Sequence, residues 1–184
     1  MQCSTCQALT AENAALKAEV HRRGWNPYLG MLNQAGLLSA MDTLPWGFYT
    51  LFLIDVDDMK AINTATGAHE ATDEYLKAGF RVREEIGEII GQLRGDEISC
   101  VLREGADPEA FIRRLRAQFK AQVLKEHERA FLEEQTGLDH ITVTAAWRKQ
   151  VSPDDMRSIL RELAIEVLER KTSRKAGGRR DSDQ

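Results

Sequence analysis

The segment Tyr49 to Ile54 is a continuous run of apolar and β-branched residues that ends in two alternating carboxylates, Asp55 and Asp57. A short run of this kind, without polar alternation, predicts a central β-strand that is buried on both faces. Such a strand needs a covering layer on each side of its sheet. The chain is therefore expected to be an α/β protein in which helices cover a sheet.

A second acidic feature lies at Arg94 to Ile98, RGDEI, where strand-like sequences flank Asp96 and Glu97. This pattern predicts a β-hairpin with the two acids at its tip. A strand that ends in Asp-x-Asp beside an acidic hairpin is a common way to hold Mg²⁺ for phosphoryl transfer, because hard cations prefer carboxylate oxygens. Asp also caps helices and forms turns, so the Asp-x-Asp alone would more often be structural.

The remaining hydrophobic pattern predicts helices around the sheet. We expect helices near 10–23, 32–41, 58–65, 70–85, 107–134 and 153–171, and a late strand near Ile141. The helix at 107–134 is predicted to start at Pro108. Its core residues are expected to be Phe111, Ile112, Leu115, Phe119, Val123 and Leu124. The order of elements predicts a mostly antiparallel sheet.

Composition excludes several classes of protein. With 184 residues, of which 42% are hydrophobic, the chain suits one domain with extensions. Its formal net charge of -4 argues against nonspecific nucleic-acid binding. No apolar run is long enough for a membrane span and no signal-peptide pattern is present, so a cytoplasmic location is expected.

The N-terminal segment predicts a short helix with a possible role in assembly. Leu9, Asn13, Leu16 and Val20 recur at steps of four and three, which is typical of a coiled-coil seam. We expect this helix to form a homodimer, and the alternative is that it packs on its own domain. The Cys3-x-x-Cys6 pair lacks further zinc ligands, so either two reduced thiols or a zinc shared between two chains would fit.

Five motifs, in order along the chain, resemble those of the GGDEF family, the diguanylate cyclases that condense two GTP into cyclic di-GMP. They are NPYLGMLNQAGL at 26–37, the Asp55–Asn63 segment with Met59 at a Phe position, Gly67 to Leu76, the RGDEI signature and ITVTAAW at 141–147. The resemblance implies a palm-like, ferredoxin-like fold similar to that of nucleotidyl cyclases. It divides the chain into an N-terminal helix at 1–24, a catalytic domain at 25–172 and a charged flexible tail at 173–184.

The resemblance also implies a metal site. Asp55, Asp96 and the backbone carbonyl of Val56 would bind two divalent ions, Mg²⁺ or Mn²⁺. Glu97 would either accept the proton of the attacking hydroxyl or support a metal. Asp57 would be an indirect support or a helix cap rather than a ligand.

Other matched positions imply nucleotide contacts. Lys60 would reach the triphosphate, and Asn63 with Asp73 would read guanine, because a carboxylate can accept from the guanine N1 and N2 hydrogens. Near the C-terminus, the basic residues Lys171, Lys175 and Arg179 compete for two phosphate-binding positions, and a disordered charged end is the alternative.

Departures from the family pattern bear on turnover. Arg94 replaces a Gly of the signature, where it adds bulk but also offers a phosphate partner. Gln92 replaces an Arg, Thr72 replaces a Gly, and Ala68 is an insertion. The segment 85–88, EIGE, lacks both residues of the family's product-inhibition motif, so no feedback by cyclic di-GMP is expected there.

Three functions follow from this sequence. The first is a metal-dependent, dimeric diguanylate cyclase that uses GTP. The second is a degenerate domain that binds GTP or another nucleotide as a sensor or scaffold without turnover. The third is another palm-type nucleotidyl cyclase or polymerase-like enzyme.

Overall fold

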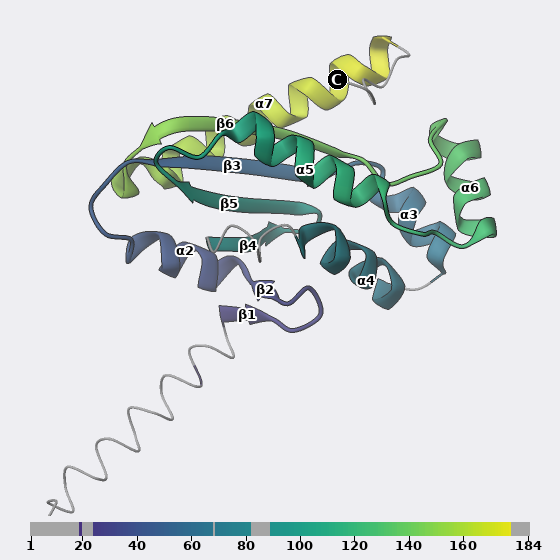
Figure 1. The fold of residues 1–184 in the computed structure, drawn as a ribbon, viewed down its shortest axis with the longest axis horizontal. Coiled ribbons are helices and arrows are strands. Elements are labelled where there is room, and N and C mark those ends of the chain that lie inside the picture. The colour runs from purple at the N-terminus through teal and green to yellow at the C-terminus, as the bar shows by residue number, and fades with distance from the viewer. Residues whose placement is uncertain (1–18, 20–23, 68, 82–88, 178–184) are drawn as a thin grey trace, which may run out of the picture.

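The computed structural model describes residues 19, 24–67, 69–81 and 89–177 of the chain. Within these ranges, one six-stranded sheet has the strand order β1-β2-β4-β5-β3-β6 (Figure 1). The strands are β1 (Trp25–Asn26), β2 (Met31–Leu32), β3 (Tyr49–Val56), β4 (Ile89–Arg94), β5 (Glu97–Arg103) and β6 (Val143–Val151). Among the strands of the described residues, only β2 and β4 pair in parallel. The predicted mostly antiparallel sheet is therefore confirmed.

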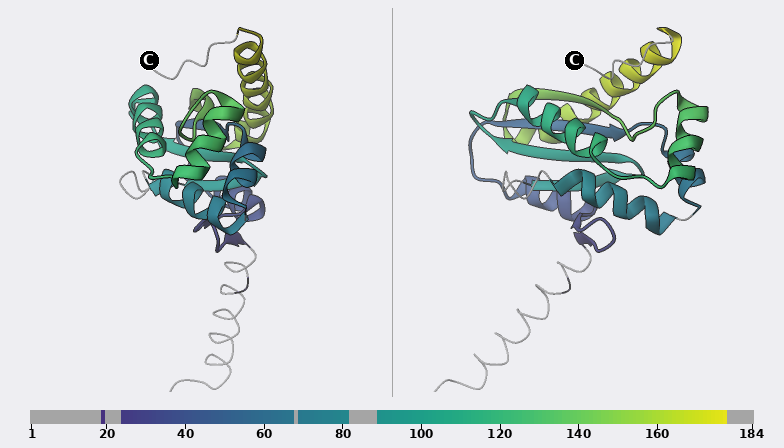
Figure 2. Two further views of the ribbon diagram at one scale, coloured as in Figure 1. Left: turned by 90° about the vertical axis from the view of Figure 1, so that its right-hand side faces the viewer. Right: turned by 45° about the vertical axis from the view of Figure 1, so that its right-hand side comes forward.

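Helices cover both faces of this sheet. They are α2 (Gln34–Asp42), α3 (Met59–Thr66), α4 (His69–Gly79), α5 (Pro108–Lys120), α6 (Glu126–Thr136) and α7 (Met156–Gly177), and the 3₁₀ turn η2 (Pro153–Asp155) precedes α7. Figure 2 shows α5 and α7 on opposite sides of the sheet. The fold is the α/β sandwich that the sequence predicted.

The central strand β3 separates two hydrophobic cores. Every residue of β3 is buried, as its continuous apolar sequence predicted. Phe52, Ile54 and Val56 belong to a core shared with α3, α4, α5 and α6. Leu51 and Leu53 belong to a second core, shared with α2 and α7. Because successive side chains of a strand point to opposite faces, the residue that follows Ile54 lies on the α7 side.

The predicted single helix at 107–134 is wrong, because two helices occupy this range. The first, α5, ends at Lys120, and α6 begins at Glu126. Val123, which we expected in the core, lies between them and is 89% exposed. The predicted core residues of α5 itself, Phe111 to Phe119, are buried.

Two other predicted helix ends are shifted. The described part of α4 ends at Gly79, before the predicted end at residue 85. The last helix, α7, continues to Gly177, past the expected end near Lys171. Several predictions lie outside the described residues. They concern the N-terminal helix (apart from Glu19) with its coiled-coil seam, Cys3 and Cys6, Ala68, the 85–88 segment and Arg179.

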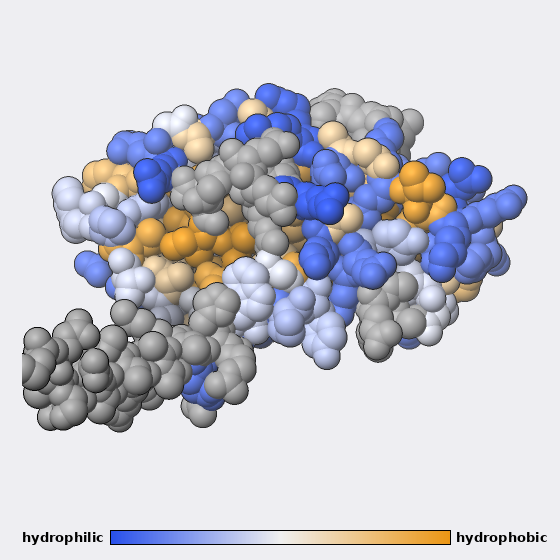
Figure 3. Space-filling model, turned by 60° about the horizontal axis from the view of Figure 1, so that its bottom comes forward, coloured by the Kyte–Doolittle hydropathy of each residue, from blue (hydrophilic) through white to orange (hydrophobic). Residues whose placement is uncertain are grey.

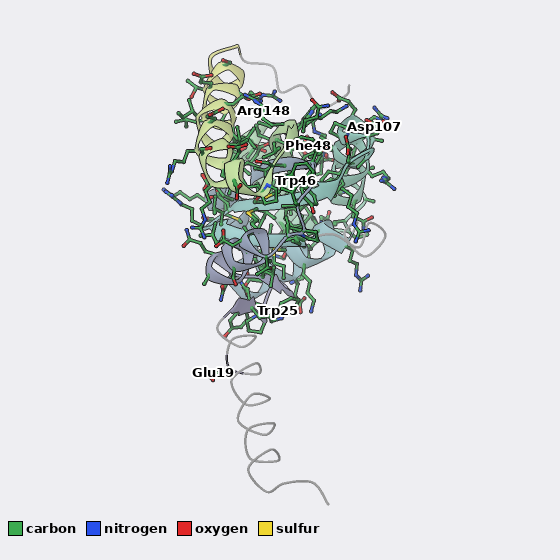
Figure 4. The ribbon with its side chains drawn as sticks, turned by 90° about the vertical axis from the view of Figure 1, so that its left-hand side faces the viewer. Glu19, Trp25, Trp46, Phe48, Asp107 and Arg148 are labelled. Carbon is green, nitrogen blue, oxygen red and sulfur yellow. The ribbon has the colours of Figure 1, made fainter. Side chains whose placement is uncertain are left out.

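The start of β3 forms the end of the sheet opposite the acidic residues. Trp46 and Phe48 lie there, as Figure 4 shows from that side. Their ring centroids are 6.1 Å apart. Trp46 is 86% exposed. Figure 3 presents another face, on which hydrophilic residues surround a hydrophobic area. None of the helices in the described ranges combines the length and apolar character that a membrane span requires.

Candidate active site

The end of β3 brings Asp55 beside the hairpin of β4 and β5. Asp55 pairs directly with Glu97 of β5 on one side and with Thr144 of β6 on the other. Directly paired residues share a face of the sheet, so these three side chains lie on the α7 side. The predicted meeting of the Asp-x-Asp strand end and the acidic hairpin is thus present.

The hairpin turn itself consists of Gly95 and Asp96. Gly95 has a φ of +52°, a left-handed conformation that favours glycine. The carbonyl of Asp96 accepts a hydrogen bond from the Val56 amide at 3.2 Å, so the turn is joined to the end of β3. Val56 and Asp96, two predicted metal-site residues, are therefore neighbours through their backbones.

Gln92 braces this turn from β4. Its side-chain amide donates to the Gly95 carbonyl at 2.6 Å, and its carbonyl oxygen accepts from Asn26 at 2.8 Å. Asn26 is also fixed, because its oxygen accepts from the Tyr28 and Leu29 amides. Sequence reasoning treated Gln92 only as a departure from the family. In the sequence, the signal for a bracing role was the predicted hairpin turn that follows Gln92.

Lys171 lies against the same corner from α7. Its ammonium group donates to Asp55 Oδ1 and, at 3.4 Å, to the carbonyl oxygen of Val56. The Oδ1 atom of Asp57 is 3.9 Å away. The Lys171 side chain is 22% exposed and that of Asp55 is 13% exposed, so the ion pair is largely shielded from water.

Asp57 is held by β6 rather than left open to solvent. Thr144 donates to its Oδ1 at 2.6 Å and Thr142 donates to its Oδ2 at 2.9 Å. Its amide also donates to the Thr142 carbonyl at 2.9 Å. Because each carboxylate oxygen already accepts a hydroxyl, Asp57 ties the end of β3 to β6, which agrees with its predicted supporting role.

Burial controls the charge of Asp55. Desolvation raises the pKa of Asp55 to about 6, although the hydrogen bond from Lys171 acts in the opposite direction. The negative charges of Asp96 and Asp57 add to the increase. Asp96 is therefore close enough to Asp55 for their charges to interact, as a shared cation site requires.

Arg94 lies at the edge of this corner. Its side chain is 78% exposed, and its Nε atom is 3.8 Å from Glu97 Oε2. The predicted bulk at the signature glycine position therefore points largely into solvent. Arg94 is placed to meet an anion that approaches the hairpin.

The predicted guanine and phosphate contacts lie on the neighbouring helices. Lys60 and Asn63 are one turn apart on α3, and Asp73 is on α4. The Oδ1 atom of Asn63 is buried without a hydrogen-bond partner. The hydroxyls of Thr66 and Thr72 are 3.0 Å apart and join the two helices. Lys175 belongs to the last described turns of α7.

The donor atoms at the end of β3 fit a divalent cation. The Asp55 carboxylate and the Val56 carbonyl already share a cationic group, the Lys171 ammonium, and Asp96 adds a second carboxylate nearby. Three or more acidic, His or Cys side chains do not gather around one point in the described ranges. Mg²⁺ suits this smaller set, because it takes few protein ligands and completes its shell with water and phosphate.

Comparison with known proteins identifies the fold. The chain matches no protein-family model and no curated protein sequence at a significant level. The diguanylate cyclase SiaD from Pseudomonas aeruginosa, solved with its activator SiaC, is similar with a TM-score of 0.62 and 20% identity. The match covers 92% of this chain and 65% of the SiaD chain, so this chain spans slightly less than two thirds of SiaD.

Two structures of DgcB from Caulobacter crescentus with c-di-GMP are also similar. Its GGDEF domain has a TM-score of 0.58 and 15% identity, over 85% of this chain and 89% of that one. The form that includes the coiled coil has the same TM-score and identity, over 96% and 95%. This protein therefore has the fold of a GGDEF domain.

Proposed function

We propose that this protein is a diguanylate cyclase that condenses two GTP molecules into cyclic di-GMP. The observation that carries the proposal is the meeting of Asp55, Val56, Asp96 and Glu97 at one end of β3, through strand pairing and the Val56–Asp96 hydrogen bond. The GGDEF fold supports it, since SiaD is described as a diguanylate cyclase and DgcB was solved with c-di-GMP. The reaction would take place in the cytoplasm.

The metal-binding groups would be the Asp55 and Asp96 carboxylates and the Val56 carbonyl. A bound Mg²⁺ or Mn²⁺ supplies charge neutralisation on the triphosphate and polarises the reacting phosphate. The protein contributes a buried carboxylate at a fixed strand end and a turn braced by Gln92. Both features keep the oxygen atoms in place before the nucleotide arrives.

The chemical step is a phosphoryl transfer that occurs twice. The 3′-oxygen of one GTP attacks the α-phosphorus of the other, the bond to the β-phosphate oxygen breaks, and pyrophosphate leaves. The hydroxyl proton goes to Glu97, whose carboxylate is 24% exposed beside Asp55 and can pass the proton to water. Two such steps convert two GTP into one cyclic di-GMP and two pyrophosphates.

The residues on α3 and α4 would select the nucleotide. The exposed Lys60 reaches the triphosphate as a point charge. Asn63 has a buried oxygen that lacks a partner, and such an atom gains from a hydrogen-bond donor. Guanine carries donors at N1 and N2, which Asn63 and Asp73 would accept, whereas adenine offers no equivalent pair. Arg94, Lys171 and Lys175 would contribute further phosphate contacts.

Two copies of the chain would meet for catalysis. Each site holds one GTP, so the condensation requires a second site that faces the first. We propose a homodimer through the N-terminal helix, and a similar structure of DgcB includes a coiled coil. A rate per chain that rises with protein concentration, together with dimer formation in sedimentation, would support this arrangement.

Incubation with nucleotides tests the proposed activity. Purified protein is mixed with GTP, ATP or both, with Mg²⁺ or Mn²⁺, and the products are identified by mass spectrometry. We expect cyclic di-GMP from GTP, with a loss of more than about a hundredfold in Asp55→Ala and Asp96→Ala. Asp154→Asn, an exposed acidic position in the η2 turn that precedes α7, is the charge control. Wild-type rates in the Asp96 variant would reject metal catalysis at this site, and GTP binding without product would indicate a nucleotide-binding domain.

A further inference from the structure

The ammonium group of Lys171 occupies the position where a metal ion would meet β3. It contacts Asp55 Oδ1 and the Val56 carbonyl oxygen, which are two of the three groups proposed to hold the metal. We infer that Lys171 is the resident cation of this site in the metal-free protein, and that a divalent ion must displace it from Asp55. This inference rests on the proposed metal site and deepens it.

The alternation of β3 places these partners together. Asp55 follows Ile54 and therefore lies on the face that α7 covers. On α7, Leu163 and Val167 are buried in the core of that face, about two turns and one turn before Lys171, respectively. The helix is thus fixed over the end of β3 by packing, and Lys171 extends from it toward the carboxylate.

Arg170 holds the same turn of α7 against β6. Its guanidinium donates to the Ala145 carbonyl at 2.7 Å and to Glu166 at 2.5 Å, and it lies over the Trp147 ring at 5.8 Å. Glu166 also accepts from Arg148 at 2.7 Å. These contacts anchor the backbone beside Lys171, so this turn of α7 stays over the end of β3 whether or not the ion pair is formed.

Electrostatics favour Asp55 paired with the Lys171 ammonium over Asp55 without a cationic partner. Asp55 is largely buried, and an ionised buried carboxylate is costly unless a positive charge lies beside it. Asp57 does not compete strongly for the ammonium, because Thr142 and Thr144 already donate to its two oxygens. The Lys171 charge is therefore directed to Asp55.

A divalent ion that binds both Asp55 Oδ1 and the Val56 carbonyl oxygen would take the position of the Lys171 ammonium, which contacts these same two atoms. Metal binding must therefore break the Lys171–Asp55 pair, which lowers the apparent metal affinity of the site. The displaced ammonium stays on α7 and needs another anion, and the triphosphate is the anion that enters with the metal. Lys171 would thus exchange a carboxylate for a phosphate when the site is loaded.

Metal binding without nucleotide gives the first test. Free Mn²⁺ is measured by electron paramagnetic resonance during titration of wild type, Lys171→Met and Arg161→Met, an exposed position on the same helix that removes the same charge. We expect Lys171→Met to bind Mn²⁺ about tenfold more tightly than wild type, because the competing ion pair is gone. Arg161→Met should match wild type.

The Asp55→Asn change distinguishes a failure of the proposed metal site from a failure of the inference about Lys171. If Asp55→Asn in the Lys171→Met background leaves Mn²⁺ binding unchanged, the metal does not bind at this site, and the inference falls together with the metal part of the proposed function. If Asp55→Asn abolishes binding but Lys171→Met does not tighten it, the inference alone is wrong. Binding by Lys171→Met but not by wild type would support it.

Amine reactivity gives the second test and detects displacement directly. The full-length protein is treated briefly with an acetylating reagent, with and without Mg²⁺, and acetylation of Lys171 is measured by peptide mass spectrometry. We expect Mg²⁺ to raise Lys171 acetylation several-fold while the exposed Lys149 stays constant. Asp55→Asn should raise it without Mg²⁺ and remove the effect of Mg²⁺. Equal acetylation with and without saturating Mg²⁺ would overturn the inference.

Discussion

Asp55 and Glu97 are direct partners across the β3 and β5 strands, so the proposed metal ligand and the proposed proton acceptor share one face of the sheet. Strand register fixes this pair. A shift by one residue would send one of the two side chains to the opposite core. The chemistry proposed for this corner therefore depends on the same pairing that builds the hydrophobic core.

The folding stability is expected to depend on the charge of Asp55. Burial raises its pKa to about 6, from an ordinary value of 3.8. Between these values the folded protein binds the proton more tightly than the unfolded chain does, so the free energy of unfolding should fall as the pH rises from about 4 to about 6. The contribution is on the order of 3 kcal/mol, at about 1.36 kcal/mol per pKa unit.

Urea denaturation between pH 4 and pH 7 measures this dependence. Asp55→Asn cannot titrate, so its free energy of unfolding should lack the fall that wild type shows between pH 4 and pH 6. Carboxyl groups that do not interact with Asp55 contribute equally to both proteins, and the comparison removes them. The same slope in the two proteins would contradict the raised pKa.

Removal of the Thr144 hydroxyl should destabilise the protein. Thr144 is fully buried and donates to Asp57 at 2.6 Å, so Thr144→Val leaves a buried carboxylate oxygen without this donor. We expect a loss of about 1–3 kcal/mol in the free energy of unfolding. Thr50→Val is a matched control, because Thr50 is also buried in the sheet but does not contact Asp57. A similar loss in both variants would show that shape, rather than the hydrogen bond, matters.

The sequence predicted the sheet better than the helices around it. The apolar run of β3 and the hairpin are local patterns, and both were confirmed. The break between α5 and α6 has no Gly or Pro to mark it. It is fixed by Glu128, whose carboxylate accepts from the Lys125 amide at 2.9 Å and from the Tyr75 hydroxyl at 2.6 Å. Because Tyr75 is distant in sequence, helical periodicity alone could not locate this helix start.

Only part of the candidate site was predicted, again because some of its contacts join residues that are distant in sequence. Motif spacing located the acidic residues, and strand pairing brought them together. The contact between Lys171 and Asp55 was not expected, because β3 is buried on both faces and its sequence does not indicate which face each helix covers. The bracing role of Gln92 likewise depends on Asn26, which comes from another strand.

Gln92 and Asn26 should behave as a coupled pair. Asn26→Ala removes the bond to Gln92 and also the acceptor for the Tyr28 and Leu29 amides, so it should destabilise the protein more than Gln92→Ala does. In a double-mutant cycle followed by urea denaturation, we expect a coupling free energy of about 0.5–1.5 kcal/mol. Additive effects would indicate that the two side chains act independently. Gln92→Ala should also slow product formation by about tenfold or more, because the hairpin turn loses its brace.

Arg94 is expected to affect nucleotide binding and not folding. Its side chain is mostly exposed, and its 3.8 Å contact with Glu97 is a surface ion pair of small energetic value. Arg94→Ala should therefore change the free energy of unfolding by less than about 0.5 kcal/mol.

The same substitution should weaken GTP binding several-fold, because a guanidinium at the hairpin edge is a good partner for phosphate. Isothermal titration with a non-hydrolysable GTP analogue in the presence of Mg²⁺ measures this effect. Arg161→Ala, which removes an exposed arginine from α7, controls for net charge. If Arg94→Ala instead tightens binding, the arginine obstructs the site, and Arg94→Gly should then raise the rate of product formation.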